Sequence, residues 1–87
     1  MSSIKLINIT NPFNSSTTIR YVICQRSSVK ISVYNFLGEE IREMVNVEKD
    51  PGTYKVVFDA KELKGGIYYY TIRTGNYTQS KKMILVK

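Results

Sequence analysis

Hydrophobic and polar residues alternate along most of the chain, and this period of two predicts β-strands. The clearest case is residues 29–34, where Val29, Ile31 and Val33 alternate with polar neighbours. We expect a strand there with one buried and one wet face. The same alternation predicts strands at residues 4–9, 17–24 and 54–58. Pro12, which lacks a backbone donor, follows the first of these, so we expect it to be an edge strand.

The strongest strand prediction covers residues 65–74, where two glycines precede a run of aromatic and β-branched residues. We expect this to be the central strand, with Tyr68, Tyr70 and Ile72 facing the core. The residues at 75–76, Gly and Asn, tolerate positive φ and predict a turn. The chain then returns through residues 80–87, which predicts a C-terminal hairpin.

Two segments are ambiguous. Ile41, Met44 and Val45 fit either a fourth strand or a single helical turn, and their β context favours the strand. Residues 59–64 fit about one helical turn or a compact crossover anchored by Leu63. Between them, Pro51 followed by Gly52 predicts a tight turn.

The pattern as a whole, about seven short strands separated by turn residues, predicts an all-β fold: an immunoglobulin-like antiparallel β-sandwich that forms a single domain over residues 1–87. Gly66 precedes Tyr68 at the start of a late strand, where such sandwiches tie a tyrosine hydroxyl back to the backbone. Gly52 and Tyr54 repeat the pattern.

Charge raises the question of an anionic partner, because 13 Lys and Arg residues face only 7 Asp and Glu residues, a net charge of +6. Tyr34, Tyr69 and Arg73 could line a base-stacking face. The charges are scattered, however, and the tyrosines fall mostly at core positions. We therefore expect a solvated basic surface and no nucleic-acid partner.

The residues needed for catalysis are scarce, since the chain has no histidine and a single cysteine. Glu39, Glu40 and Glu43 lie across a turn and an exposed face, where solvated carboxylates are expected. We expect Cys24 to be a small apolar filler of the core. The sequence thus predicts no enzyme, no metal and no cofactor.

No stretch reaches the roughly 18 to 20 apolar residues of a membrane span, and residues 1–4 lack the pattern of a secretion signal. Either the chain is cytoplasmic, or it is a piece of a longer precursor with its export signal upstream.

The last strand is apolar on both sides, with Met83 and Leu85 facing one way and Ile84 and Val86 the other. One side must pack in the sandwich. The other side is either covered by loops or left as an edge that another protein recognises by strand pairing. That protein could be a second copy of this chain, which would form an edge-strand homodimer.

Six segments in this order resemble the C-terminal sorting domain of type A cargo in the type IX (Por) secretion system of Bacteroidetes, a family similar to the immunoglobulin-like domain of flagellar hook-capping proteins. The segments are Asn11-Pro12-Phe13-Asn14, residues 16–21, residues 33–41, residues 51–54 with 58–60, Leu63 with residues 66–70, and residues 81–87.

This resemblance implies that the chain is a secretion signal at the end of a longer exported precursor. An outer-membrane translocon would recognise it, a sortase-like peptidase would remove it, and its cargo would pass through the periplasm to the cell surface or the medium. The terminal signal of the family maps onto Lys81, Lys82, Met83, Ile84, Leu85, Val86 and Lys87. The family positions that serve the fold are Gly38, Gly52, Gly66 and Tyr68.

This chain departs from the family pattern in two ways. Ser15 stands where a proline often follows the Asn-Pro-Phe-Asn segment, and no cargo or cleavage region is present. The alternative function is a passive accessory module of a secreted protein, which binds polysaccharide or spaces other domains.

Overall fold

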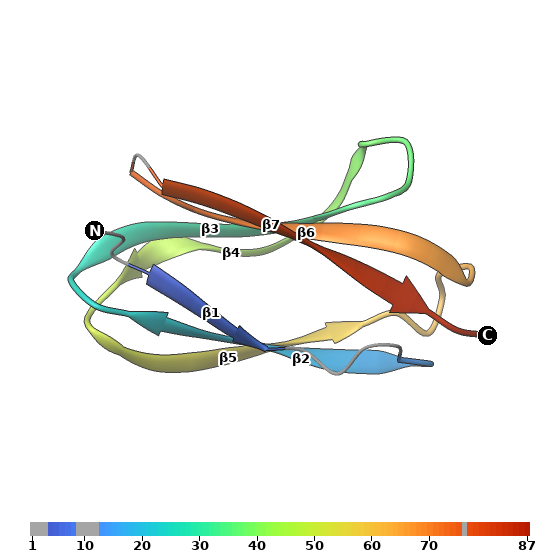
Figure 1. Cartoon of the computed structure of the whole chain (residues 1–87), viewed down its shortest axis with the longest axis horizontal. Coiled ribbons are helices and arrows are strands. Elements are labelled where there is room, and N and C mark those ends of the chain that lie inside the picture. Colours follow the sequence, from blue (N-terminus) through green and yellow to red (C-terminus); the bar gives the residue numbers. More distant parts are fainter. Residues whose placement is uncertain (1–3, 9–12, 76) are drawn as a thin grey trace.

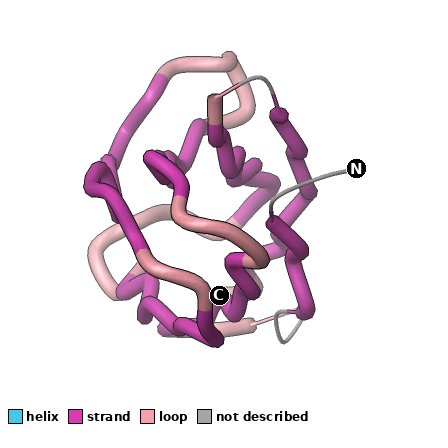
Figure 2. Tube along the Cα trace, turned by 90° about the vertical axis from the view of Figure 1, so that its left-hand side faces the viewer, coloured by secondary structure: helices cyan, strands magenta, loops and turns pink. Residues whose placement is uncertain are grey.

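The computed structural model describes residues 4–8, 13–75 and 77–87, the first range by its backbone alone, and these form two packed layers of strands (Figure 1). The strands are β1 (Ile4–Asn8), β2 (Ser16–Ile23), β3 (Ser27–Tyr34), β4 (Glu40–Lys49), β5 (Gly52–Asp59), β6 (Gly66–Thr74) and β7 (Tyr77–Leu85). Figure 2 shows only strands and loops in this part of the chain.

One sheet has the strand order β1-β2-β5 and the other the order β4-β3-β6-β7, with every neighbouring pair antiparallel. The predicted all-β antiparallel sandwich is therefore confirmed. The strand predicted to be central, β6, lies between β3 and β7, and β1 is an edge strand as expected. The order matches the immunoglobulin constant type except that the fourth strand pairs with the third, in the second sheet.

The core lies between the sheets and is filled by alternate residues of the inner strands, as the period-two pattern predicts. Its buried hydrophobic residues are Phe13, Ile19, Tyr21, Ile23, Val29, Ile31, Val33, Phe58, Ala60, Tyr70, Ile72, Met83 and Leu85. Tyr21 stacks on Tyr54 with ring centroids 5.5 Å apart. Burying thirteen such side chains is the main favourable term in the stability of a domain of this size.

Two cations of β4 cover the side of the sandwich where β4 and β5 run as edges of opposite sheets. The Arg42 guanidinium lies 5.0 Å from the centroid of the Phe58 ring and donates to the carbonyl oxygen of Asp59. At the other end, Lys49 Nζ lies 4.7 Å from the centroid of the Tyr54 ring. Such contacts add roughly 0.5–1 kcal/mol each at exposed positions, and here they join the two sheets.

The predicted wet face of the third strand is wrong in part, because Ser32 is only 2% exposed. Its register neighbours are Glu43 on β4 and Thr71 on β6. The serine side chain is shorter than the glutamate beside it, so it extends less far toward solvent. Its Oγ has no hydrogen-bond partner among the residues that the structure describes.

The prediction for Cys24 is also wrong, since this cysteine is exposed. It follows the buried Ile23 directly, and the alternation along β2 turns the next side chain outward.

The two ambiguous segments are resolved. The residues around Met44 form β4, as favoured. Residues 60–65 form a compact crossover, in which the Leu63 N–H donates to the Ala60 carbonyl at 3.1 Å and Leu63 packs against the core. β7 begins at Tyr77, three residues before the predicted start of the last strand.

Candidate recognition site at the C-terminal strand

The site predicted from the sequence occupies the end of β7 and the two residues after it. β7 is an edge strand of the four-stranded sheet and pairs with β6 along its whole length. In this register Met83 lies opposite Tyr68, and Ile84 lies opposite Ile67. Figure 1 shows the strand crossing the front of the sandwich before the chain ends.

Burial alternates along the segment as the sequence predicts. Met83 and Leu85 are 0% and 2% exposed and belong to the core, whereas Ile84 and Val86 are 38% and 51% exposed. The segment thus has an anchoring side and a displayed side, and both are apolar.

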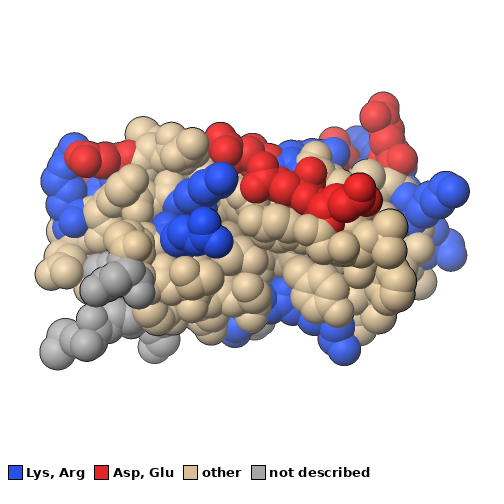
Figure 3. All heavy atoms as spheres, turned by 90° about the horizontal axis from the view of Figure 1, so that it is seen from above, with Lys and Arg blue, Asp and Glu red and all other residues tan. Residues whose placement is uncertain are grey.

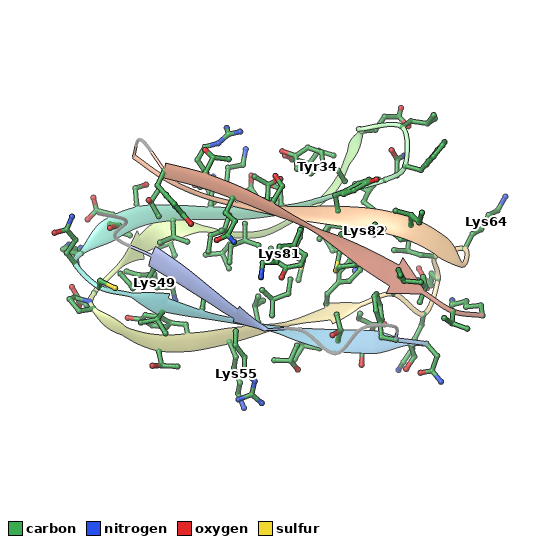
Figure 4. The ribbon with its side chains drawn as sticks, viewed as in Figure 1. Tyr34, Lys49, Lys55, Lys64, Lys81 and Lys82 are labelled. Carbon is green, nitrogen blue, oxygen red and sulfur yellow. The ribbon has the colours of Figure 1, made fainter. Side chains whose placement is uncertain are left out.

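The three lysines of the segment are all exposed. Lys81 has the inward parity of Met83, and in Figure 4 its side chain extends from β7 toward the three-stranded sheet. The Lys87 Nζ donates to the carbonyl oxygen of Lys61, which holds the last residue against the crossover.

Phe13, which belongs to no strand of the four-stranded sheet, forms backbone hydrogen bonds with the end of β7. Its N–H donates to the Ile84 carbonyl at 3.0 Å, and its own carbonyl accepts from Val86 N–H at 2.7 Å, a parallel bridge opposite Leu85. The Phe13 ring meets Phe58 edge-on, with centroids 6.2 Å apart. The sequence does not predict this bridge, because no local pattern links two positions so far apart in the chain.

The close approach of Gly65 to the end of β7 is a second feature of the site that the sequence did not predict. A Cβ at this position would lie 3.2 Å from the Leu85 carbonyl oxygen and 3.3 Å from the Lys87 nitrogen. A side chain at position 65 would therefore require the backbone at the end of β7 to move by a few tenths of an ångström.

Two of the residues expected to serve the fold, Gly66 and Tyr68, lie beside this segment. Gly66 and Tyr68 lie opposite Leu85 and Met83 in the β6–β7 pairing. The Tyr68 hydroxyl donates to the Lys64 carbonyl at 2.7 Å, which is the tyrosine corner expected from the sequence. Gly66 has φ 148° and Gly38, in the β3–β4 loop, has φ 85°. Residues other than glycine rarely adopt these values.

Gly52 and Tyr54 repeat the same arrangement in the other sheet. The Tyr54 hydroxyl donates to the Asp50 carbonyl at 2.6 Å. The weaker of the two sequence patterns is thus confirmed as a second tyrosine corner.

Beyond recognition, the described residues could act through a metal site, a charged cluster or a membrane-spanning helix. They contain no group of three or more His, Cys, Asp or Glu side chains placed to hold a metal ion. Glu40 and Glu43 lie 3.8 Å from Lys30 Nζ, so they take part in surface ion pairs. No helix in this part of the chain has the length and apolar character needed to span a bilayer.

The family model described as "Secretion system C-terminal sorting domain" matches residues 10–87, which include all of the candidate site. The chain belongs to this family. The type IX sorting domain therefore acts as a C-terminal sorting signal, as its resemblance implied. A comparison with curated proteins finds no match.

Membership of the family also gives the destination and the general partners. The sorting domain marks a protein for export across the outer membrane to the cell surface or the extracellular space. It implies an interaction with the type IX machinery and a cargo upstream. The family is not a catalytic one.

Proposed function

We propose that residues 81–87 are the part of the sorting domain that the outer-membrane translocon recognises. We further propose that the domain ends a longer precursor, and that a sortase-like peptidase removes it when the cargo is attached at the surface. The domain then acts only as an address and takes no part in the activity of the cargo.

The observation that supports this proposal is the division of the segment into an anchored and a displayed side. Met83 and Leu85 fix the strand in the core, while Ile84 and Val86 are presented to the surface between exposed lysines. Phe13 already bonds the Ile84 carbonyl and the Val86 N–H on the outer edge of the strand. A partner would therefore read this segment through pockets for the alternate, displayed side chains.

The test is export of a reporter that carries a signal peptide and this chain at its C-terminus, in a bacterium with the type IX system. Deletion of residues 81–87 would be ambiguous, because it also removes two core residues. We would instead make Ile84→Thr with Val86→Thr, which changes the displayed side alone. The matched control is Val47→Thr with Val57→Thr, two valines that are 51% and 56% exposed elsewhere.

We expect the Ile84→Thr, Val86→Thr reporter to stay in the periplasm while the control reporter is exported. Thermal melting of both purified domains checks that they fold. Normal export of the first variant would show that the displayed side is not read and would place the signal elsewhere in the domain. The passive accessory module is not favoured; it predicts that the reporter stays in the periplasm even with the unchanged domain.

The edge-strand homodimer remains a separate prediction. β4 is a poor candidate for pairing because its ladder with β3 has two register irregularities, which twist an edge away from a partner. Sedimentation of the purified domain over a range of concentrations tests the dimer directly, and a constant monomer mass would exclude it.

A further inference from the structure

Four exposed hydrophobic side chains gather at one end of the four-stranded sheet. Phe36 and Leu37 of the β3–β4 loop are 73% and 75% exposed, and Ile67 and Ile84 are each 38% exposed. Ile67 lies directly opposite Ile84 in the β6–β7 ladder. Together we name these four residues the apolar patch.

The patch includes a hollow of about 450 Å³, lined by Phe36, Leu37 and Ile67 together with Lys64 and its neighbours in the chain. Seen from above in Figure 3, acidic side chains form a band over the outer face of the sheet, and uncharged surface continues beside it toward the right-hand end. Contiguous apolar surface of this kind marks interaction sites in soluble proteins.

The loop that carries Phe36 and Leu37 is held in a fixed shape by its own hydrogen bonds. The Asn35 side-chain oxygen accepts from the N–H groups of Leu37 and Glu39 at 2.9 and 3.0 Å. The Asn35 N–H donates to the Glu39 carbonyl at 2.9 Å, and the Gly38 N–H to the Asn35 carbonyl at 3.0 Å.

None of these bonds uses the side chain of Phe36 or Leu37, so the turn would form as well with polar residues at both positions. The fold therefore does not require two large apolar side chains there. A rigid loop loses little conformational entropy when a partner binds, which makes it a favourable platform for recognition.

We propose that the apolar patch is a second part of the surface that the type IX machinery reads, and that the machinery places an apolar side chain, bordered by carboxylates, in the hollow. Ile84 belongs both to the patch and to the displayed side of β7, so the two parts are continuous. Lys64 lines the hollow and projects into solvent at that end of the molecule (Figure 4). This inference rests on the proposed function, because it extends the same recognition surface.

The first test uses the same export reporter with Phe36→Ser and Leu37→Ser combined, and Val57→Thr as the control for loss of an exposed apolar group. Truncating the central residues of an interface commonly weakens binding by a factor of ten or more, so we expect export to fall at least about tenfold. The control should be exported normally, and both domains should melt close to the wild type.

A charge reversal tests the carboxylates of the partner. Lys64→Glu should lower export several-fold, whereas Lys55→Glu, on the opposite outer face of the sandwich in Figure 4, should not. If the two charge reversals lower export equally, net charge explains the loss. That result would overturn the proposal that carboxylates of the partner border the hollow.

The outcomes separate this inference from the proposal on which it rests. If Ile84→Thr with Val86→Thr stops export and Phe36→Ser with Leu37→Ser does not, the patch is not read and only this inference fails. If neither pair matters, the proposed recognition surface fails as a whole. If the patch variant abolishes a dimer seen by sedimentation and leaves export intact, the patch binds a second copy and the inference is overturned.

Discussion

The Tyr68 hydroxyl donates a 2.7 Å hydrogen bond to the carbonyl oxygen of Lys64, four residues earlier in the chain. This bond closes the corner through which the crossover enters β6. Because Tyr68 also lies opposite Met83 in the β6–β7 ladder, the corner fixes the start of the strand against which the C-terminal segment is built.

Replacement of Tyr68 by Phe should destabilise the domain, because the ring would stay and the Lys64 carbonyl would lose its donor. We expect the free energy of unfolding to fall by about 1 kcal/mol, which lowers Tm by roughly 4–8 °C in a domain of this size. Urea and thermal unfolding measure the change.

The matched control for this variant is Tyr69→Phe, since Tyr69 is 38% exposed and its hydroxyl makes no hydrogen bond to the described residues. Tyr54→Phe should behave like Tyr68→Phe, because its hydroxyl bonds the Asp50 carbonyl in the same way. Equal stabilities of the Tyr68 and Tyr69 variants would show that the corner bond contributes nothing net.

The alternation along residues 83–86 predicts a sharp contrast in stability between variants at inward-facing and outward-facing positions. Met83→Ala opens a cavity in the core and should cost about 2–5 kcal/mol. Val86→Ala removes a half-exposed side chain and should cost about 0.5 kcal/mol or less. Urea unfolding compares the two, and similar losses would contradict the division into an anchored and a displayed side.

Local patterns predicted most of the fold because they record which side of a strand meets the core. The alternation of Ile19, Tyr21 and Ile23 and the glycines before Tyr54 and Tyr68 each act within a few residues, so they can be recognised without a structure. At Cys24 the residue type and the period-two alternation predicted different exposure, and the alternation was right. Cysteines are commonly buried, yet Cys24 follows an inward-facing residue and its side chain points outward.

The candidate site was predictable only in part, for the same reason. The order of Met83 and Ile84 along the strand gave their opposite exposure. The bridge from Phe13 joins segments at opposite ends of the chain and depends on how the two sheets meet. Phe36 and Leu37 are large apolar residues of the kind usually found in a core. Only the geometry of their loop places them on the surface.

Gly65→Ala should loosen the end of β7. The added Cβ would approach the Leu85 carbonyl oxygen to 3.2 Å, and this backbone cannot retreat easily because Phe13 bonds both of its neighbours. Overpacking of this kind costs about 1–3 kcal/mol. We expect faster hydrogen exchange at the Val86 amide, measured by NMR, whereas Lys64→Ala should leave that amide protected. Unchanged protection in the Gly65 variant would mean that the chain end adapts without strain.

Two buried tyrosines should make the domain sensitive to alkali. Burial raises the pKa of Tyr70, and burial followed by the proximity of Tyr54 raises the pKa of Tyr21. A tyrosine whose folded pKa lies above its unfolded value, about 10, contributes stability that is fully present below pH 10 and is lost as the pH rises through the folded pKa. Urea unfolding from about pH 8 to about pH 11 should therefore show falling stability at the alkaline end. The fall should be shallower in Tyr21→Phe with Tyr70→Phe and unchanged in the exposed control Tyr69→Phe. An equal fall in all three proteins would assign the alkaline loss to the lysines instead.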